Sequence, residues 1–131
     1  AEALPELLYQ INPYVAYESI CVKVTPENVK ELFSEYPIVC EAFDAPDQKA
    51  MLVRELLIQC PKTTVISGNG MAGYADTNTI KTQQMTKRLY VCGDQSTDIG
   101  NGNGLIAPRV AACAPHEANK VLQLIMQEKC D

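Results

Sequence analysis

Three glycines and one acid form the most obvious candidate for a ligand site. Gly68, Gly70 and Gly73 make the pattern G-x-G-x-x-G directly after a short apolar run, and Asp94 follows at about the separation expected of a ribose-binding acid. Such a motif binds a dinucleotide when its third glycine opens a helix, because the helix N-terminus then holds the pyrophosphate. Residues 74–79 are turn formers and β-branched residues, which predict no helix. We therefore interpret the motif as a glycine-rich bend. An NAD-binding oxidoreductase domain is the alternative, and it requires a helix starting near Gly73.

Asp44 is the second candidate, because it lies just past an apolar run that predicts a buried strand. Ligands of open parallel sheets bind outside the carboxyl ends of the strands. One hypothesis is that Asp44 or Asp47 caps the helix expected to follow. The other is that Asp44 holds Mg²⁺ or orients the phosphates of a nucleotide, since hard cations prefer carboxylate oxygens. Residue type and spacing alone favour capping.

The cysteines, the histidine and one arginine are less suggestive. Six cysteines are spread at fairly even intervals with no C-x-x-C pair, so no zinc site is expected. A disulfide framework is an alternative for an even count, but four cysteines sit among small apolar residues and are interpreted as free, buried thiols: Cys21, Cys40, Cys92 and Cys113. His116 is expected at the surface or in packing. Arg109 is expected as a surface charge near a helix end, with a contact to phosphates or a carrier tail as the alternative.

The elements that position these residues alternate over the first half of the chain. Helices are predicted at residues 1–11, 25–37 and 47–59, and strands at residues 14–24, 38–43 and 63–67. Thr25 followed by Pro26 is a helix-start signal, and Pro37 ends that helix. Alternation at this spacing predicts parallel strands joined by right-handed crossovers, and hence an α/β fold.

The second half changes character. Strands are predicted at residues 79–85, as a sheet edge, and 89–92, with a polar loop at 94–104 and a helix at 105–128. Pro115 is expected to kink or restart that last helix, because proline removes one of its hydrogen bonds. The core candidates of this helix are Val110, Val121, Leu122, Leu124 and Ile125.

Composition bounds the function. The chain has 131 residues, of which 47% are apolar and 21% charged, with a net charge of -5. Phosphate backbones attract basic surfaces, so nucleic acid is not expected as a partner. No run of 18 apolar residues and no basic, apolar start are present, so neither a membrane span nor a signal peptide is expected. These features predict one domain over residues 1–131 of a cytoplasmic protein.

The order of features resembles a known family. From Ile11-Asn12-Pro13, a strand-like run and a short helix lead to an apolar run ending in Asp44, as in the middle of the ThiF/MoeB family, bacterial relatives of ubiquitin-activating enzymes. Tyr90-Val-Cys-Gly-Asp94 and residues 104–114, GLIAPRVAACA, are similar to the shorter ThiF-type proteins of thiamine biosynthesis. The resemblance covers nearly the whole chain.

This resemblance implies a Rossmann-like, three-layer domain with parallel strands followed by an antiparallel edge. It implies that Asp44 is the family's ATP- and Mg²⁺-associated aspartate, and that the backbone near Cys21 and Val22 faces the adenine. The implied reaction is adenylation of the C-terminal glycine of a ThiS-like sulfur-carrier protein, with release of pyrophosphate. Family members usually dimerise, so a homodimer is expected.

Departures from the family are mostly absences. By the resemblance, the ATP-binding glycine loop, the ribose-binding acid and a phosphate-contacting lysine would precede Ala1, so we expect the chain to be an incomplete domain. A fragment of this kind is expected to be inactive alone and to behave as a non-catalytic, dimerising module. The zinc-binding C-x-x-C pairs of many MoeB-like members are missing. Residues 97–100 lack the cysteine with which some ThiF enzymes bond to the carrier, so a covalent sulfur-transfer step is not expected.

Overall fold

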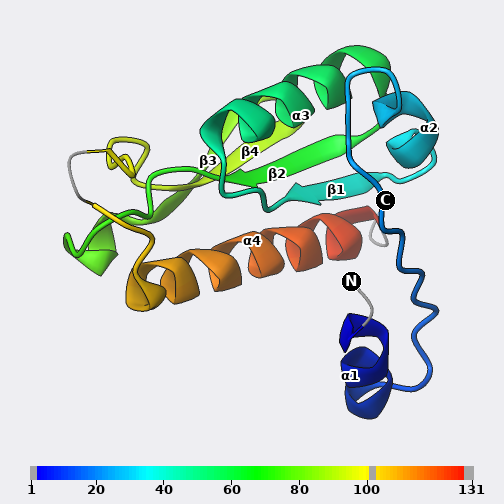
Figure 1. Ribbon diagram of the computed structural model, residues 1–131, viewed down its shortest axis with the longest axis horizontal. Coiled ribbons are helices and arrows are strands. Elements are labelled where there is room, and N and C mark those ends of the chain that lie inside the picture. Colours follow the sequence, from blue (N-terminus) through cyan, green and yellow to red (C-terminus); the bar gives the residue numbers. More distant parts are fainter. Residues whose placement is uncertain (1–2, 101–102, 129–131) are drawn as a thin grey trace.

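The computed structural model describes residues 3–100 and 103–128, and its centre is a four-stranded sheet between two layers of helices (Figure 1). The strands are β1 (Ile38–Glu41), β2 (Thr64–Gly68), β3 (Lys81–Thr86) and β4 (Leu89–Gly93), in the order β1-β2-β4-β3. β1, β2 and β4 run parallel, and β3 is antiparallel to β4. The predicted α/β fold, with parallel strands and an antiparallel edge, is confirmed.

Two apolar clusters fill the spaces between the layers. On one face of the sheet, Val39 and Val65 pack against Leu52 and Leu56 of α3 (Pro46–Gln59) and against Val29 of α2 (Val29–Phe33). On the other face, a second cluster packs against α4 (Ala107–Glu128); its buried members are Ile66, Ile80, Cys92 and Cys113. The neighbours Val65 and Ile66 are both fully buried, which is why β2 reads as a continuous apolar run.

The end of α3 is fixed by Arg88, from the turn between β3 and β4. The Arg88 guanidinium donates hydrogen bonds to the carbonyls of Leu57, Cys60 and Thr63 at 2.9, 3.1 and 2.7 Å. The last carbonyls of a helix have no partners within it, so these bonds satisfy groups that would otherwise be left unpaired. Because its packed face and its C-terminal end are both fixed, the N-terminus of α3 has a defined position next to the end of β1.

The N-terminal part differs from the prediction. α1 (Ala3–Ile11) forms where expected, but it has no buried residue and stands away from the sheet (Figure 1). The strand predicted at residues 14–24 is wrong: that segment is irregular and exposed, because no described strand lies beside it to complete a ladder. The second helix starts at Val29 rather than Thr25. The Asn28 side chain accepts a hydrogen bond from the Thr25 N–H at 2.8 Å. Residues 25–28 therefore form a turn that precedes the helix.

Other boundaries are sharper than predicted. β1 ends at Glu41 rather than residue 43, and its Cys40 is exposed, so the strand is not buried on both faces. α4 runs without a restart through Pro115, and Val121 and Leu124 pack on the sheet as predicted. Leu122 and Ile125 do not, with exposures of 56% and 40%. In the part of the chain that the structure describes, no helix is long and apolar enough to cross a membrane.

Candidate functional site

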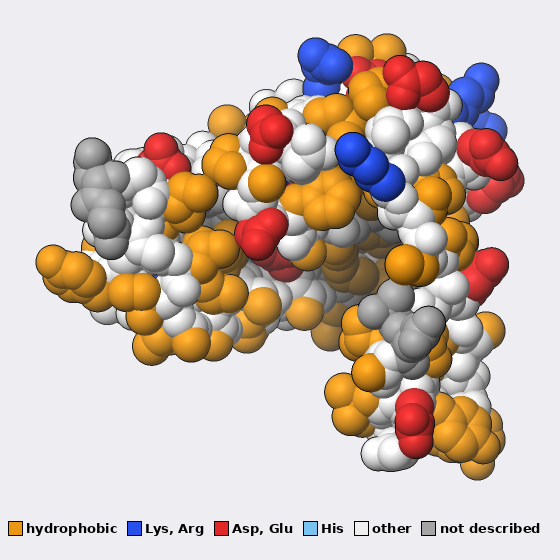
Figure 2. All heavy atoms as spheres, in the orientation of Figure 1, with side chains coloured by type: hydrophobic (Ala, Val, Ile, Leu, Met, Phe, Trp, Pro, Cys, Tyr) orange, Lys and Arg blue, Asp and Glu red, His pale blue; other side chains and the backbone are white. Residues whose placement is uncertain are grey.

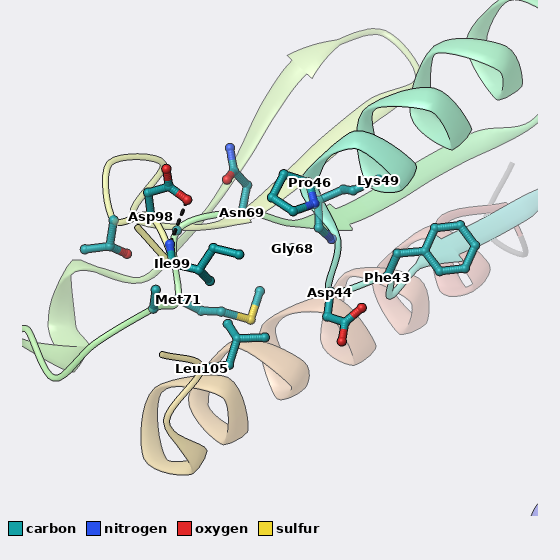
Figure 3. Close-up of a pocket in the computed structure, with 13 residues that line it drawn as sticks. Phe43, Asp44, Pro46, Lys49, Gly68, Asn69, Met71, Asp98, Ile99 and Leu105 are labelled. Carbon is teal, nitrogen blue, oxygen red and sulfur yellow. Dashed lines mark hydrogen bonds between the residues drawn. The ribbon is translucent and has the colours of Figure 1, made fainter. Parts of the chain in front are cut away.

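A cavity of about 110 Å³ opens at the carboxyl ends of β1 and β2 (Figure 3). The loop after β1 contributes Phe43 and Asp44, the start of α3 contributes Lys49, and the loop after β2 contributes Asn69. Apolar side chains close the remaining side; they are Met71, Ile99 and Leu105. An open α/β sheet binds its ligands at this end, because strand ends and helix starts converge there.

Asp44 lines this cavity, and its carboxylate has no hydrogen-bond partner among the described residues. The N-cap of α3 is Ala45, and no side chain caps the helix, so the capping hypothesis for Asp44 and Asp47 is wrong. Asp47 instead accepts a hydrogen bond from Gln48 at 3.3 Å. Among the described residues, nothing donates a hydrogen bond to the Asp44 carboxylate or forms an ion pair with it. A carboxylate that the fold does not use is available to a ligand.

The two residues predicted near the adenine are placed differently from each other. Val22 lines a second cavity, of about 220 Å³, together with Asp44 and Phe43. Cys21 is exposed and lines neither this cavity nor the first. The structure therefore brings Val22 to Asp44, and the contact of both residues with adenine stays a prediction.

A buried ion pair lies beside the cavity. The Glu41 carboxylate, fully buried at the end of β1, accepts hydrogen bonds from the Lys49 ammonium at 2.6 Å and the Ser67 hydroxyl at 2.5 Å. The backbone N–H of Phe43 donates to the other carboxylate oxygen at 2.6 Å. A buried charge is tolerated only when it is paired and hydrogen-bonded, and three donors supply this. Neither residue of this pair was predicted from the sequence as part of the site. The only available signal was a glutamate inside an apolar run.

The glycine motif is a bend, as predicted. Gly70 and Gly73 have φ of +84° and +70°, a left-handed conformation that side chains rarely adopt. After Gly73 the chain makes a turn and the short 3₁₀ helix η1 (Thr77–Thr79), then enters β3. The helix required by the dinucleotide-binding alternative is therefore absent from this described stretch.

Arg109 of α4 is buried and binds the backbone of this bend. The prediction that it is a surface charge is therefore wrong. It is 2% exposed, and its guanidinium pairs with Asp94 at 2.6 Å. It also donates to the carbonyls of Ala75, Asp76 and Gly70, at 2.7, 2.9 and 3.4 Å. A guanidinium presents its donors in a rigid fork, which suits it to join several carbonyls at once. Both terminal nitrogens of Arg109 and both oxygens of Asp94 bind groups of the fold, whereas the Nε of Arg109 is buried without a partner among the described residues.

The pKa of Asp94 is lowered well below its usual range. Burial alone would raise its pKa, but the N–H and hydroxyl groups of Thr97 and Ser96 donate to the carboxylate and lower the pKa from 3.8 to about 2. Hydrogen bonds to the charged form stabilise that form, so Asp94 stays ionised beside Arg109. The position that resembled a ribose-binding acid is a structural anion.

The cysteines of the described ranges fall into a buried and an exposed group. All five cysteines in the described ranges are free, as predicted, and Cys92 and Cys113 are buried. Burial, followed by the nearby Glu117 charge, raises the pKa of Cys113 to about 12. Cys21 and Cys40 are exposed, so the predicted burial is wrong for them, and Cys130 lies outside the described residues. Because the thiolate is the nucleophile, Cys113 is unsuited to covalent chemistry.

Glu117 and His116 extend from α4 toward the sheet. Burial raises the pKa of the Glu117 carboxyl, which accepts a hydrogen bond from the Cys113 thiol at 3.6 Å. A Cβ on Gly68 would lie 2.6 Å from a Glu117 carboxylate oxygen, so the glycine allows this close approach. His116 is half-buried, with its Nδ1 at 3.2 Å from the Thr82 hydroxyl, which fits the packing role predicted for it.

A sheet-end cavity with a free carboxylate is typical of α/β proteins that bind nucleotides or other phosphates. The ThiF family model matches residues 1–131, and this chain belongs to the ThiF family. No curated protein sequence matches the chain.

Solved structures of similar fold include E. coli tRNA N6-threonylcarbamoyladenosine dehydratase, TcdA. Its complex with ATP aligns with a TM-score of 0.82 and 19% identity, and its complex with AMP with 0.80 and 19%. In both cases the alignment covers 99% of this chain and 65% of the other. A third TcdA structure aligns with a TM-score of 0.79 and 20% identity, over 99% and 65% of the two chains. The chain thus spans about two thirds of the TcdA length, and the Rossmann-like fold is confirmed.

Proposed function

We propose that the intact protein to which this chain belongs uses ATP to adenylate a carboxylate. The observation that carries the proposal is the uncommitted Asp44 carboxylate at the cavity where β1 and β2 end. Membership of the ThiF family and the nucleotide complexes of TcdA support ATP as the co-substrate. The proposal concerns the intact protein because the chain spans 65% of the TcdA chains.

The residues present fit Mg²⁺ as the metal that accompanies ATP. Asp44 and Asp98 both line the cavity and offer carboxylate oxygens, the ligands that Mg²⁺ prefers. In the described ranges, no group of three or more His, Cys, Asp or Glu side chains is placed to hold a metal alone. Magnesium commonly binds through one or two carboxylates plus substrate phosphates, so Asp44 would hold it only when nucleotide is present. Bound there, the ion supplies neutralisation of phosphate charge.

The reaction is a displacement at phosphorus. A carboxylate oxygen of the acceptor bonds to the α-phosphorus of ATP, the bond from that phosphorus to the β-bridging oxygen breaks, and pyrophosphate leaves with the electron pair. The enzyme's part in such a transfer is mainly positioning and charge stabilisation. Asp44 would hold the metal that accompanies the phosphates, and the apolar side chains of Met71, Ile99 and Leu105 would shield the mixed anhydride from water on their side of the cavity.

The acceptor that we propose is the C-terminal glycine of a ThiS-like sulfur-carrier protein. Residues 90–94 and 104–114 favour it, because they resemble thiamine-biosynthesis members of the family. In this proposal the backbone near Cys21 and Val22 contacts the adenine, which is consistent with the cavity that Val22 shares with Asp44. The intact protein would act as a homodimer, since apolar side chains of α1 and α4 are exposed, among them Leu7 and Leu122.

The test is isotope exchange between labelled pyrophosphate and ATP by the intact protein. We expect exchange with Mg²⁺ and a ThiS-like carrier, and none with the same carrier lacking its terminal glycine, because the attacking carboxylate is then displaced. Excess chelator should abolish the exchange. Absence of exchange with cognate carrier and metal would contradict the proposal.

A tRNA acceptor is the second candidate, favoured by the likeness to TcdA, whose name describes a dehydratase of a modified tRNA nucleoside. A threonylcarbamoyl group carries a carboxylate that ATP could activate in the same way. The net charge of -5 argues against it, because RNA phosphates are attracted to basic surfaces. Supplying modified tRNA in place of the carrier in the exchange assay decides between the two acceptors.

A further inference from the structure

The ion pair of Lys49 and Glu41 suggests a role that sheet stability alone does not require. Glu41 lies directly opposite Ser67 in the register of β1 and β2, and its buried carboxylate accepts from Ser67, Phe43 and Lys49. The backbone amide and the hydroxyl already bind this carboxylate within the sheet. The ammonium is the one partner that arrives from another layer, and its other side borders the cavity.

Lys49 has donors to spare. An ammonium group has three N–H donors, and Glu41 is the one partner found for Lys49 within residues 3–100 and 103–128. The Lys49 side chain keeps 19% exposure, whereas the Glu41 side chain has none. In Figure 3 the ammonium end of Lys49 reaches from α3 toward Gly68 and Asn69, at the carboxyl end of β2.

The charges around the cavity make this ammonium important. Of the residues that line the cavity, Asp44 and Asp98 carry negative charge and Lys49 carries positive charge. A phosphate entering the cavity meets two carboxylates, so it needs a positive charge at the cavity that offsets them. Charge-assisted hydrogen bonds from a cation to phosphate are among the stronger contacts in proteins.

We infer that Lys49 binds a phosphate oxygen of the nucleotide and that Glu41 is the positioning residue that holds its ammonium at the cavity. This inference rests on the proposed function, and it assigns the side of the site opposite Asp44. Glu41 restricts the rotation of a flexible side chain, so less conformational entropy is lost when the ligand binds.

The binding test uses titration calorimetry of the intact protein with MgATP. Lys49→Met should weaken binding roughly 10- to 100-fold, the loss expected for one hydrogen bond to a charged group. Lys49→Arg should recover part of that loss. Lys62→Met is the matched control, because Lys62 is exposed in the turn at the opposite end of α3 and should change binding less than about twofold.

A second variant covers the case in which Lys49→Met fails to fold because Glu41 is left buried without its partner. The double variant Glu41→Gln with Lys49→Met removes both charges and keeps the carboxamide available to Ser67. The double variant should show a cooperative thermal unfolding transition, as a folded protein does. Its affinity for MgATP should fall by the same factor as that expected for Lys49→Met.

The role of Glu41 is read from kinetics. Glu41→Gln should raise the KM for ATP several-fold with a smaller change in kcat, because Lys49 remains but is held less firmly. If Glu41 has only a structural role, Glu41→Gln should lower the free energy of unfolding and leave the KM for ATP unchanged. Intact wild-type protein without MgATP binding or exchange would contradict the proposed function, and the inference with it. If the wild-type protein binds MgATP and Lys49→Met binds it with the same affinity, the inference is overturned and the proposed function still stands.

Discussion

The loops that follow the parallel strands β1 and β2 use their polar groups in opposite ways. After β2, the glycine bend is tied down: Arg109 and Asp94 pair with each other, and Arg109 also binds the carbonyls of Gly70, Ala75 and Asp76. After β1, the Asp44 carboxylate is bound to nothing in the described chain, and Asp44 lines a cavity. A familiar motif therefore marks structure, and a single unremarkable acid marks the candidate site.

Surface views add a second contrast. Orange side chains cover much of the detached α1 and the cavity end of the molecule in Figure 2, whereas charges gather around α2 and α3. Large exposed apolar residues of the cavity end include Tyr74, Ile99 and Leu105. An apolar rim around the site suits the proposed carrier protein, because its C-terminal tail would enter the cavity while an apolar face of the carrier packs on the rim.

Removing Arg109 should give the largest effect on stability. Arg109→Met leaves Asp94 buried without its partner, and we expect a loss of roughly 3–5 kcal/mol in the free energy of unfolding, measured with urea. Arg54→Met is the control, because the Arg54 side chain is 66% exposed and Gln59 also donates to its partner Glu55, so the loss should be less than about 1 kcal/mol. Equal, small losses for both variants would show that the bend is not held by Arg109.

A side chain at Gly70 should come next. The added Cβ of Gly70→Ala would collide with Asp94 and Gln95, and φ of +84° is unfavourable for alanine. Strain and overpacking at about 1–3 kcal/mol each predict a loss of roughly 3 kcal/mol. Gly104→Ala is the matched control, since nothing lies within 4 Å of its added Cβ. Thermal unfolding of the two variants measures the difference, and a Gly70→Ala variant as stable as Gly104→Ala would refute the account of the bend.

Acid should weaken the bend selectively. The pKa of Asp94 is lowered to about 2 in the folded chain, so its stabilisation is present above about pH 4 and is lost as the pH falls toward 2. The difference in pKa corresponds to on the order of 2 kcal/mol. Unfolding free energies of wild type and Asp94→Asn between pH 5 and pH 2 should converge as the pH falls. A constant difference would mean that the carboxylate charge does not stabilise the fold.

Much of the sheet could be predicted from sequence. Buried runs such as residues 63–67, and the strong pattern of residues 47–59, have a local cause, because apolar periodicity reports burial. The strand predicted at residues 14–24 fails because strand formation depends on a partner, which local pattern does not reveal.

The candidate site could be predicted only in part. Asp44 follows from its place after a strand. Arg109 and the Glu41–Lys49 pair join residues from different elements, so their burial depends on packing, and the charge of each suggested a surface position. Sequence indicated where the site lies, but it did not show which charges the fold itself consumes.

The central claim is that Asp44 serves a ligand and not the fold. The most direct test compares pyrophosphate exchange by the intact protein with Asp44→Asn and with Asp47→Asn, an exposed acid three residues along the chain. The account predicts that Asp44→Asn slows exchange roughly 10²- to 10³-fold, the usual loss when one electrostatic contact to the reacting groups is removed. Its free energy of unfolding should change by less than about 0.5 kcal/mol, and Asp47→Asn should retain exchange. Exchange by Asp44→Asn at the wild-type rate would contradict the claim.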